Sequence, residues 1–125
     1  MAKEEMVGRI RGAHSRRLPL ELAELLTPPL EHALNHPLRR EILRALNESD
    51  EPLSAAELVA ASLPKTSVTL VNYHASVLET CDLVRIAENE LAGESPVRRY
   101  ASTVTEDVQI LAVLGATEAL DRLDG

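Results

Sequence analysis

Between Thr66 and Ile86 the chain reads TSVTLVNYHASVLETCDLVRI, and its polar and apolar positions separate at the period of a helix. One stripe collects neutral hydrogen-bonding side chains: Thr69, Asn72, Tyr73, Ser76 and Thr80. The opposite stripe is apolar and consists of Val68, Val71, Ala75 and Leu78, widened by Leu70, His74, Val77 and Cys81. Between Thr66 and Cys81 only Glu79 is charged. The pattern predicts a half-buried helix whose neutral donors and acceptors suit base edges in a DNA groove, or a polar face that touches only water.

Two short segments after this helix predict a β-hairpin. Residues 83–87 and 97–101 read as paired strands, and the segment between them contains Gly93 and Pro96 and is turn-like. A helix followed at once by a two-stranded hairpin forms the back half of a winged helix-turn-helix. We therefore expect a mainly α chain with a small β-hairpin wing (an α+β fold), with its recognition helix at about 67–80 and its wing at about 83–101.

Prolines mark the helices that precede this region. Residues 20–26 form a short helix that Pro28 and Pro29 stop, and Pro37 fits the first position of the next helix, 38–47. The inward positions of that helix are expected to be Ile42, Leu43 and Leu46, and the outward ones Arg39, Arg40 and Arg44.

Capping residues mark the later helices. Ser54 and Glu57 have the spacing of a capping box, which satisfies free amides at a helix start. Thr66 or Ser67 is expected to cap the recognition helix, and Thr105 a last helix at about 105–123. The chain thus divides into an N-terminal arm, 1–18, and one helix-rich domain, 19–125.

Three stretches carry a family resemblance. The run from His36 to Leu43 resembles the opening signature of ArsR-type winged-helix repressors. Their recognition-helix signature is resembled by Val71-Asn72-Tyr73-His74 through Val77-Leu78 and Leu83-Val84, and the returning strand of their wing by Arg98-Arg99-Tyr100. The resemblance covers about residues 29–103 and implies a sequence-specific, DNA-binding transcriptional regulator, a repressor by analogy, that acts on double-stranded DNA. The chain departs from the pattern at Asp82, where many members have Gly.

The resemblance and the polar stripe together name the expected DNA contacts. The residues expected to read bases are Thr69, Asn72, Tyr73 and Ser76. The residues expected to position phosphates, on the wing and elsewhere, are Arg39, Lys65, Ser67, Arg98 and Arg99.

The terminal helices carry more apolar surface than one side of a small domain needs. In ArsR-like proteins such helices form a two-fold homodimer, which presents two recognition helices to a pseudo-palindromic site. The residues expected at this interface are Leu22, Leu25, Leu26, Val108, Leu111, Leu114 and Leu120. The alternative is that both helices cap the core of their own domain.

Charge keeps a second function class open. The 125-residue chain has a net charge of −7, the wrong sign for a protein that holds DNA mainly by neutralising phosphates. Residues 1–17 are locally basic, and this arm is either a solvated tail or a minor-groove arm. The recognition helix has no Arg or Lys, and the wing carries Glu88, Glu90 and Glu94. The alternative function is therefore a winged-helix interaction module that binds a protein partner and has little or no affinity for DNA.

Other chemistry is not indicated. Cys81 is the single cysteine, which excludes an intrachain disulfide and suits a reducing cytoplasm, and no apolar run has the ~18 residues of a membrane span. His32 and His36 are too few to complete a zinc site, so neither a metal nor a cofactor is expected. His74 lies on the apolar side of its helix and is expected to be a buried, hydrogen-bonded residue. No nucleophile, base and orienting group can be named together, so we do not expect an enzyme.

Overall fold

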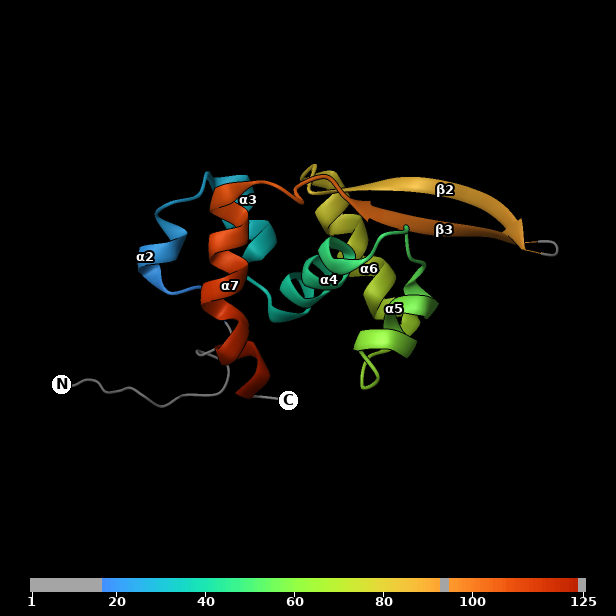
Figure 1. Ribbon diagram of the computed structural model, residues 1–125, viewed down its shortest axis with the longest axis horizontal. Helices are drawn as coiled ribbons and strands as arrows, with labels where there is room; N and C mark the ends of the chain where they lie inside the picture. The colour runs from blue at the N-terminus through green and yellow to red at the C-terminus, as the bar shows by residue number, and fades with distance from the viewer. Residues whose placement is uncertain (1–16, 93–94, 124–125) are drawn as a thin grey trace.

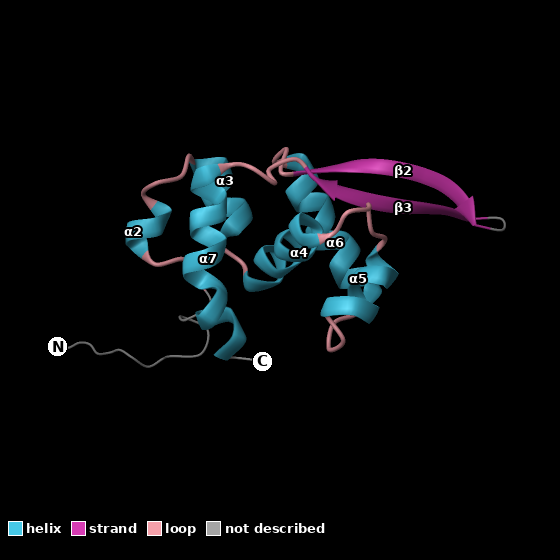
Figure 2. Ribbon diagram, in the orientation of Figure 1, coloured by secondary structure: helices cyan, strands magenta, loops and turns pink. Residues whose placement is uncertain are grey.

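The computed structural model describes residues 17–92 and 95–123. Within these residues the chain is mainly helical and has one two-stranded antiparallel sheet, as the sequence predicted (Figure 2). The elements in chain order are α2 (Leu20–Ala23), α3 (Pro28–Leu34), α4 (Pro37–Glu48), α5 (Ala55–Ser62), α6 (Val68–Thr80), β2 (Val84–Ala92), β3 (Ser95–Ser102) and α7 (Val108–Leu123). In the described residues no helix has the length and apolarity needed to cross a membrane.

Helix α4 lies at the centre of the molecule. It contacts α3 and α7 on one side and α5, α6 and β3 on the other. In Figure 1, α2, α3 and α7 form one end of the molecule, and the β2–β3 hairpin projects from the other. The core that joins these parts is mostly aliphatic and includes Leu34, Ile42, Leu43, Leu58, Val71, Leu78, Val84, Tyr100, Ile110 and Val113.

Local hydrogen bonds start α5 and α6 where the sequence predicted. Glu57 N donates to Ser54 Oγ at 3.1 Å and Ser54 N donates to Glu57 Oε1 at 2.8 Å, so the predicted capping box is confirmed. Ser67, rather than Thr66, caps α6 by accepting a hydrogen bond from Leu70 N at 3.1 Å. Pro37 occupies the first turn of α4, as expected. Helices α5 and α6 are thus joined by a short turn with defined ends.

Asp82 ends α6 in a conformation that glycine adopts more easily. Its φ angle is 65°, in the left-handed region. Asp82 N donates to the Glu79 carbonyl and Leu83 N to the Leu78 carbonyl, both at 3.0 Å, which is the Schellman pattern. This turn aims the chain from α6 directly into β2. Glycine has no Cβ to clash with the backbone at this φ angle, so Asp82 keeps the turn at a cost in strain.

The hairpin is longer than the sequence indicated. Its pairing runs from Val84 with Ser102 to Ala92 with Ser95, with an irregularity between Ile86 and Glu88. Residues 88–92 and 95–96, expected to be turn, are therefore strand, because antiparallel backbone pairing continues through them. A bridge between Leu53 and Tyr100 ties the base of the hairpin to the segment before α5. Residues 93–94, including Gly93, lie outside the described residues.

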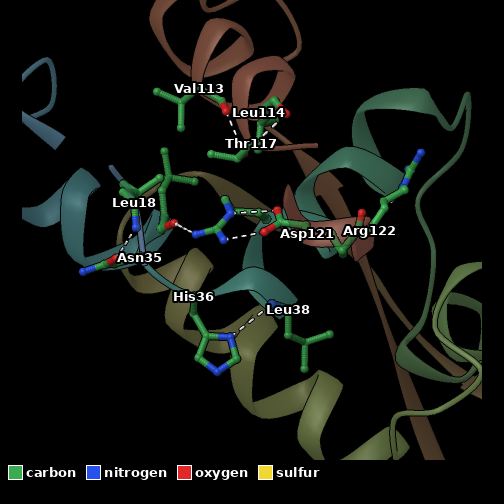
Figure 3. A network of polar contacts seen from close by, with 12 residues as sticks. Leu18, Asn35, His36, Leu38, Val113, Leu114, Thr117, Asp121 and Arg122 are labelled. Carbon is green, nitrogen blue, oxygen red and sulfur yellow. Dashed lines mark hydrogen bonds and ion pairs between the residues drawn. The ribbon is translucent and has the colours of Figure 1, made fainter. Parts of the chain in front are cut away.

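The expectation that the arginines of α4 face outward is wrong. Arg40 and Arg44 are 1% and 6% exposed. Arg40 donates to both carboxylate oxygens of Asp121 on α7, at 2.9 and 2.6 Å, and Arg44 donates to one of them at 2.8 Å. Arg44 also donates to Thr117 Oγ1 at 2.7 Å, and Figure 3 shows Asp121 and Thr117 on neighbouring turns of α7. Both guanidinium groups share Asp121, Arg40 also donates to the Leu34 carbonyl, and Arg44 also donates to the Leu114 carbonyl and pairs with Glu41, so each buried charge has several partners.

The C-terminal carbonyls of α3 have their hydrogen-bond donors on α4. Arg39 donates to the carbonyls of Ala33 and His32 at 2.7 and 3.0 Å, and Arg40 donates to that of Leu34 at 2.7 Å. The last carbonyls of a helix have no partner within it and carry partial negative charge, so guanidinium groups stabilise them. Side chains predicted from amphipathicity to be solvated are thus the C-terminal caps of a neighbouring helix.

Further differences concern the helix ends. Helix α7 begins at Val108 and is capped by Asp107, whose Oδ1 accepts from Ile110 N at 3.0 Å, not by Thr105. Residues 24–26, expected to be helical, follow the end of α2, and Pro28 and Pro29 open α3 rather than only ending α2. Proline fits the first turn of a helix because its missing N–H has no partner there.

Candidate nucleic-acid interface

Helix α6 is buried along one side. Val71, His74, Ala75 and Leu78 are buried, as the apolar stripe predicted, and Thr69, Asn72 and Tyr73 are exposed while Ser76 is half-buried. Val68 and Leu70, assigned to the apolar face by the sequence, are 41% and 45% exposed. They lie in the first turn, ahead of the part of α6 that contacts the core. Their exposure could have been expected from the Ser67 cap, because α6 starts at Val68 and both residues lie next to that cap.

Much of the polar stripe is engaged within the protein. Ser76 Oγ donates to the Tyr73 carbonyl at 2.7 Å, and Thr80 Oγ1 donates to the Ser76 carbonyl at 2.9 Å. Asn72 Oδ1 accepts a hydrogen bond from Tyr100 Oη at 2.9 Å. Tyr100 is a residue that sequence reasoning did not connect with α6. It fixes the Asn72 amide and leaves the amide N–H groups as the donors on that side chain.

His74 joins α6 to α4 on the buried side. Its Nδ1 lies 3.0 Å from Arg39 Nη1, and because guanidinium groups only donate, Nδ1 is the acceptor. The ring of His36, which caps α4 through Nδ1, lies 4.3 Å from the His74 ring, centroid to centroid. Burial, and then the charge of Arg39, lower the pKa of His74 below its ordinary value. The expectation of a buried, hydrogen-bonded His74 is confirmed.

A cleft of about 400 Å³ lies between the start of α5, the start of α6 and the hairpin. Its lining residues are Ser54, Ala55, Ala56, Val68, Asn72, Val97 and Arg98. Arg98 is exposed on the hairpin side of this cleft, and Asn72 and Val68 form the α6 side. The cleft therefore places one cation opposite the polar flank of α6.

The other predicted phosphate contacts differ in their surroundings. Lys65 is exposed in the turn before α6, and the Ser67 hydroxyl is engaged as the helix cap. Arg99 is 25% exposed and its Nε lies 3.4 Å from Glu57 Oε1. The hydrogen bonds from the Ser54 amide and from Arg99 lower the pKa of Glu57. Arg39 does not belong to this surface, because it is 7% exposed and its donors face α3 and His74.

The apolar residues assigned to a dimer interface separate into two groups. Leu26 and Leu114 are 8% and 4% exposed and belong to the core of the protein itself, so their assignment to an interface is corrected. Leu22 is half-buried and packs against the same core. The exposed members are Leu25, Val108, Leu111 and Leu120, at 53%, 80%, 40% and 37%. Leu20, 72% exposed, lies in α2 and was not assigned.

Among residues 17–92 and 95–123, no three His, Cys, Asp or Glu side chains are grouped so that they hold a metal ion. His32 is exposed, whereas His36 turns its Nδ1 to the α4 amide. Cys81 is half-buried at the end of α6.

Comparisons with known proteins assign the chain to no family. No family model matches the chain, and neither a curated protein nor a solved structure matches it.

Proposed function

We propose that the protein is a DNA-binding transcriptional regulator of ArsR type, a winged helix-turn-helix in which α6 is the recognition helix and β2–β3 the wing. The observation that carries the proposal is the arrangement around the cleft. An exposed, uncharged helix start lies beside a hairpin arginine, with Lys65 at the preceding turn. Base contacts need accessible neutral groups, and phosphate contacts need cations beside them.

Tyr73 is the clearest single test of this assignment. It is 59% exposed, so Tyr73→Ala removes a large group from the surface without opening the core. We expect the variant to bind a selected operator at least roughly tenfold more weakly, the effect of removing one base contact, while its melting temperature stays unchanged. Fluorescence anisotropy at two salt concentrations measures both affinity and salt dependence. Wild-type protein that binds no fragment of a random duplex library, at either salt concentration, contradicts the proposal.

A homodimer through the terminal helices forms part of the proposal. Leu111 and Leu120 lie on α7 and are exposed, unlike Leu114. Replacing both with Glu is expected to give folded monomers in sedimentation analysis, because charge on an apolar interface must be desolvated. Ala60→Glu, at an exposed position of α5 away from the terminal helices, introduces the same charge and is the matched control, which is expected to leave the dimer intact. A wild-type protein that is monomeric at micromolar concentration contradicts this part.

The second candidate function is a protein-interaction module. The net charge of −7 and the absence of Arg and Lys from α6 favour it, since both weaken attraction to phosphates. The two functions differ in salt dependence, because counterion release makes DNA binding weaken steeply as salt rises. A defined partner bound by the α6 surface with little salt dependence, together with no DNA binding, would favour the module.

A further inference from the structure

The exposed surface of the first turns of α6 is more apolar than the polar stripe in the sequence predicted. Leu70 and Tyr73 are 45% and 59% exposed. At the helical period, Thr69, Leu70 and Tyr73 fall within about 100° of one another, so they form one surface. Val68, 41% exposed, lies on the opposite flank of this first turn from Leu70, about 160° away around the helix, beside Asn72 and the cleft. Methyl-bearing and aromatic side chains therefore cover the N-terminal end of α6, which is the end that a recognition helix places in a major groove.

Several polar groups of this helix are already hydrogen-bonded within the protein, which leaves Thr69, the Tyr73 hydroxyl and the Asn72 N–H groups to hydrogen-bond bases. The hydroxyl protons of Ser76 and Thr80 are directed to carbonyls of α6 itself. The Asn72 carbonyl accepts from Tyr100, so a bidentate contact of this amide with adenine requires that bond to break. Helix α6 also has no Arg or Lys, the side chains that most often read guanine.

The apolar groups then decide which base the surface fits. The thymine 5-methyl is the apolar group that base pairs expose in the major groove. We propose that α6 selects its site mainly by contacts of Leu70, Tyr73 and Val68 with thymine methyl groups, an inference that rests on the proposed DNA-binding function. Lys65, exposed in the turn before α6, and Arg98, exposed beside the cleft, provide the positive charge that a DNA backbone requires and that an apolar protein partner does not.

Deoxyuridine isolates the methyl group, because it pairs as thymine does and keeps the O4 acceptor. A site is first selected from random duplexes with the full-length protein, and each thymine of a half-site is then replaced singly. We expect at least one replacement in each half-site to weaken binding about fourfold, the effect of one methyl group withdrawn from an apolar contact. Replacement of a thymine outside the protected region is the matched control and is expected to have no effect.

A double-mutant cycle assigns the contact to a residue. In Leu70→Ala, the deoxyuridine that weakens wild-type binding is expected to have no further effect, because the methyl group already lacks its partner. Leu20→Ala is the matched control, since Leu20 is an exposed leucine on α2, at the opposite end of the molecule from the hairpin (Figure 1). It is expected to retain the full sensitivity to deoxyuridine.

The outcomes separate this inference from the proposed function. Specific binding that no deoxyuridine replacement weakens, or selected half-sites without thymine, would overturn the thymine-methyl inference and leave DNA binding in place. The assignment of the methyl contact to α6 is overturned if Leu70→Ala, Tyr73→Ala and Val68→Ala all keep the full sensitivity of binding to deoxyuridine. Failure to bind any duplex would overturn both the inference and the function.

Discussion

Two arginines of α4 and Arg98 of β3 have the same charged group in opposite environments. Arg40 and Arg44 lie in the core with Asp121, whereas Arg98 is exposed beside the cleft. The first pair connects α4 with α7 and holds the helical body together. Arg98 contributes charge to a surface. Since burial makes a charge depend on its partner, the two regions are expected to respond to different perturbations.

Removal of Asp121 tests the buried side of the comparison and is expected to have the largest effect. In Asp121→Ala two buried guanidinium groups lose their shared carboxylate, which is expected to cost about 3–5 kcal/mol in the free energy of unfolding. Urea denaturation measures it. Glu118→Ala is the matched control, because Glu118 forms an ion pair on the same helix with Arg122 at 2.7 Å, with side chains 43% and 57% exposed. That pair is expected to contribute less than about 1 kcal/mol. Equal losses in the two variants would contradict the comparison.

Removal of Arg98 tests the exposed side. Arg98→Ala is expected to weaken binding to all DNA sequences alike and to lower the logarithmic salt slope by about 0.9, the value for a single phosphate neutralised by the protein. The stability of the protein is expected to stay the same, because the side chain is exposed. Anisotropy titrations over a range of salt give the slope. A loss confined to one operator sequence would show that Arg98 reads a base instead.

Acid tests the buried contact between α4 and α6, where Arg39 donates to His74. Because the pKa of folded His74 is lowered, the unfolded chain takes up a proton first as pH falls below about 6.5. His74 therefore contributes stability above this pH that decreases as pH falls through the interval toward the folded pKa. Denaturation between pH 7.5 and 5.5 measures the slope. His74→Gln is expected to flatten it, and His32→Gln, at an exposed histidine, is expected to leave it unchanged.

The smallest effect is expected at the turn from α6 into β2. Asp82→Gly relieves the cost of a positive φ angle and is expected to stabilise the protein by about 0.5–1 kcal/mol. Asp50→Gly is the matched control, since among the described non-glycine residues only Asp82 has a positive φ angle. There the substitution is expected to be neutral or destabilising. A gain at Asp50 as large as that at Asp82 would show that the effect does not come from the turn.

Local rules predicted the features that depend on near neighbours in the chain. The Ser54 capping box, the Ser67 cap and the proline at the start of α4 follow from hydrogen bonds within a few residues, and the structure confirms them. The buried stripe of α6 follows from the helical period, which sets which side chains share a side. The mainly helical fold with one hairpin is the sum of such local preferences.

Tertiary structure decided which side chains of the same type are buried and which are exposed. Nothing near Arg40 in the sequence indicates that Asp121, 81 residues away, is its partner, so amphipathicity placed the α4 arginines in solvent. The same holds for Asn72, whose carbonyl is engaged by Tyr100 from another element, and for Leu70, which contacts too little of the core to be buried. The sequence by itself determines the helices and their apolar sides, because those depend on neighbours along the chain. Pairing between distant charges and the makeup of the α6 surface depend on packing, because burial and hydrogen-bond partners exist only once the elements meet.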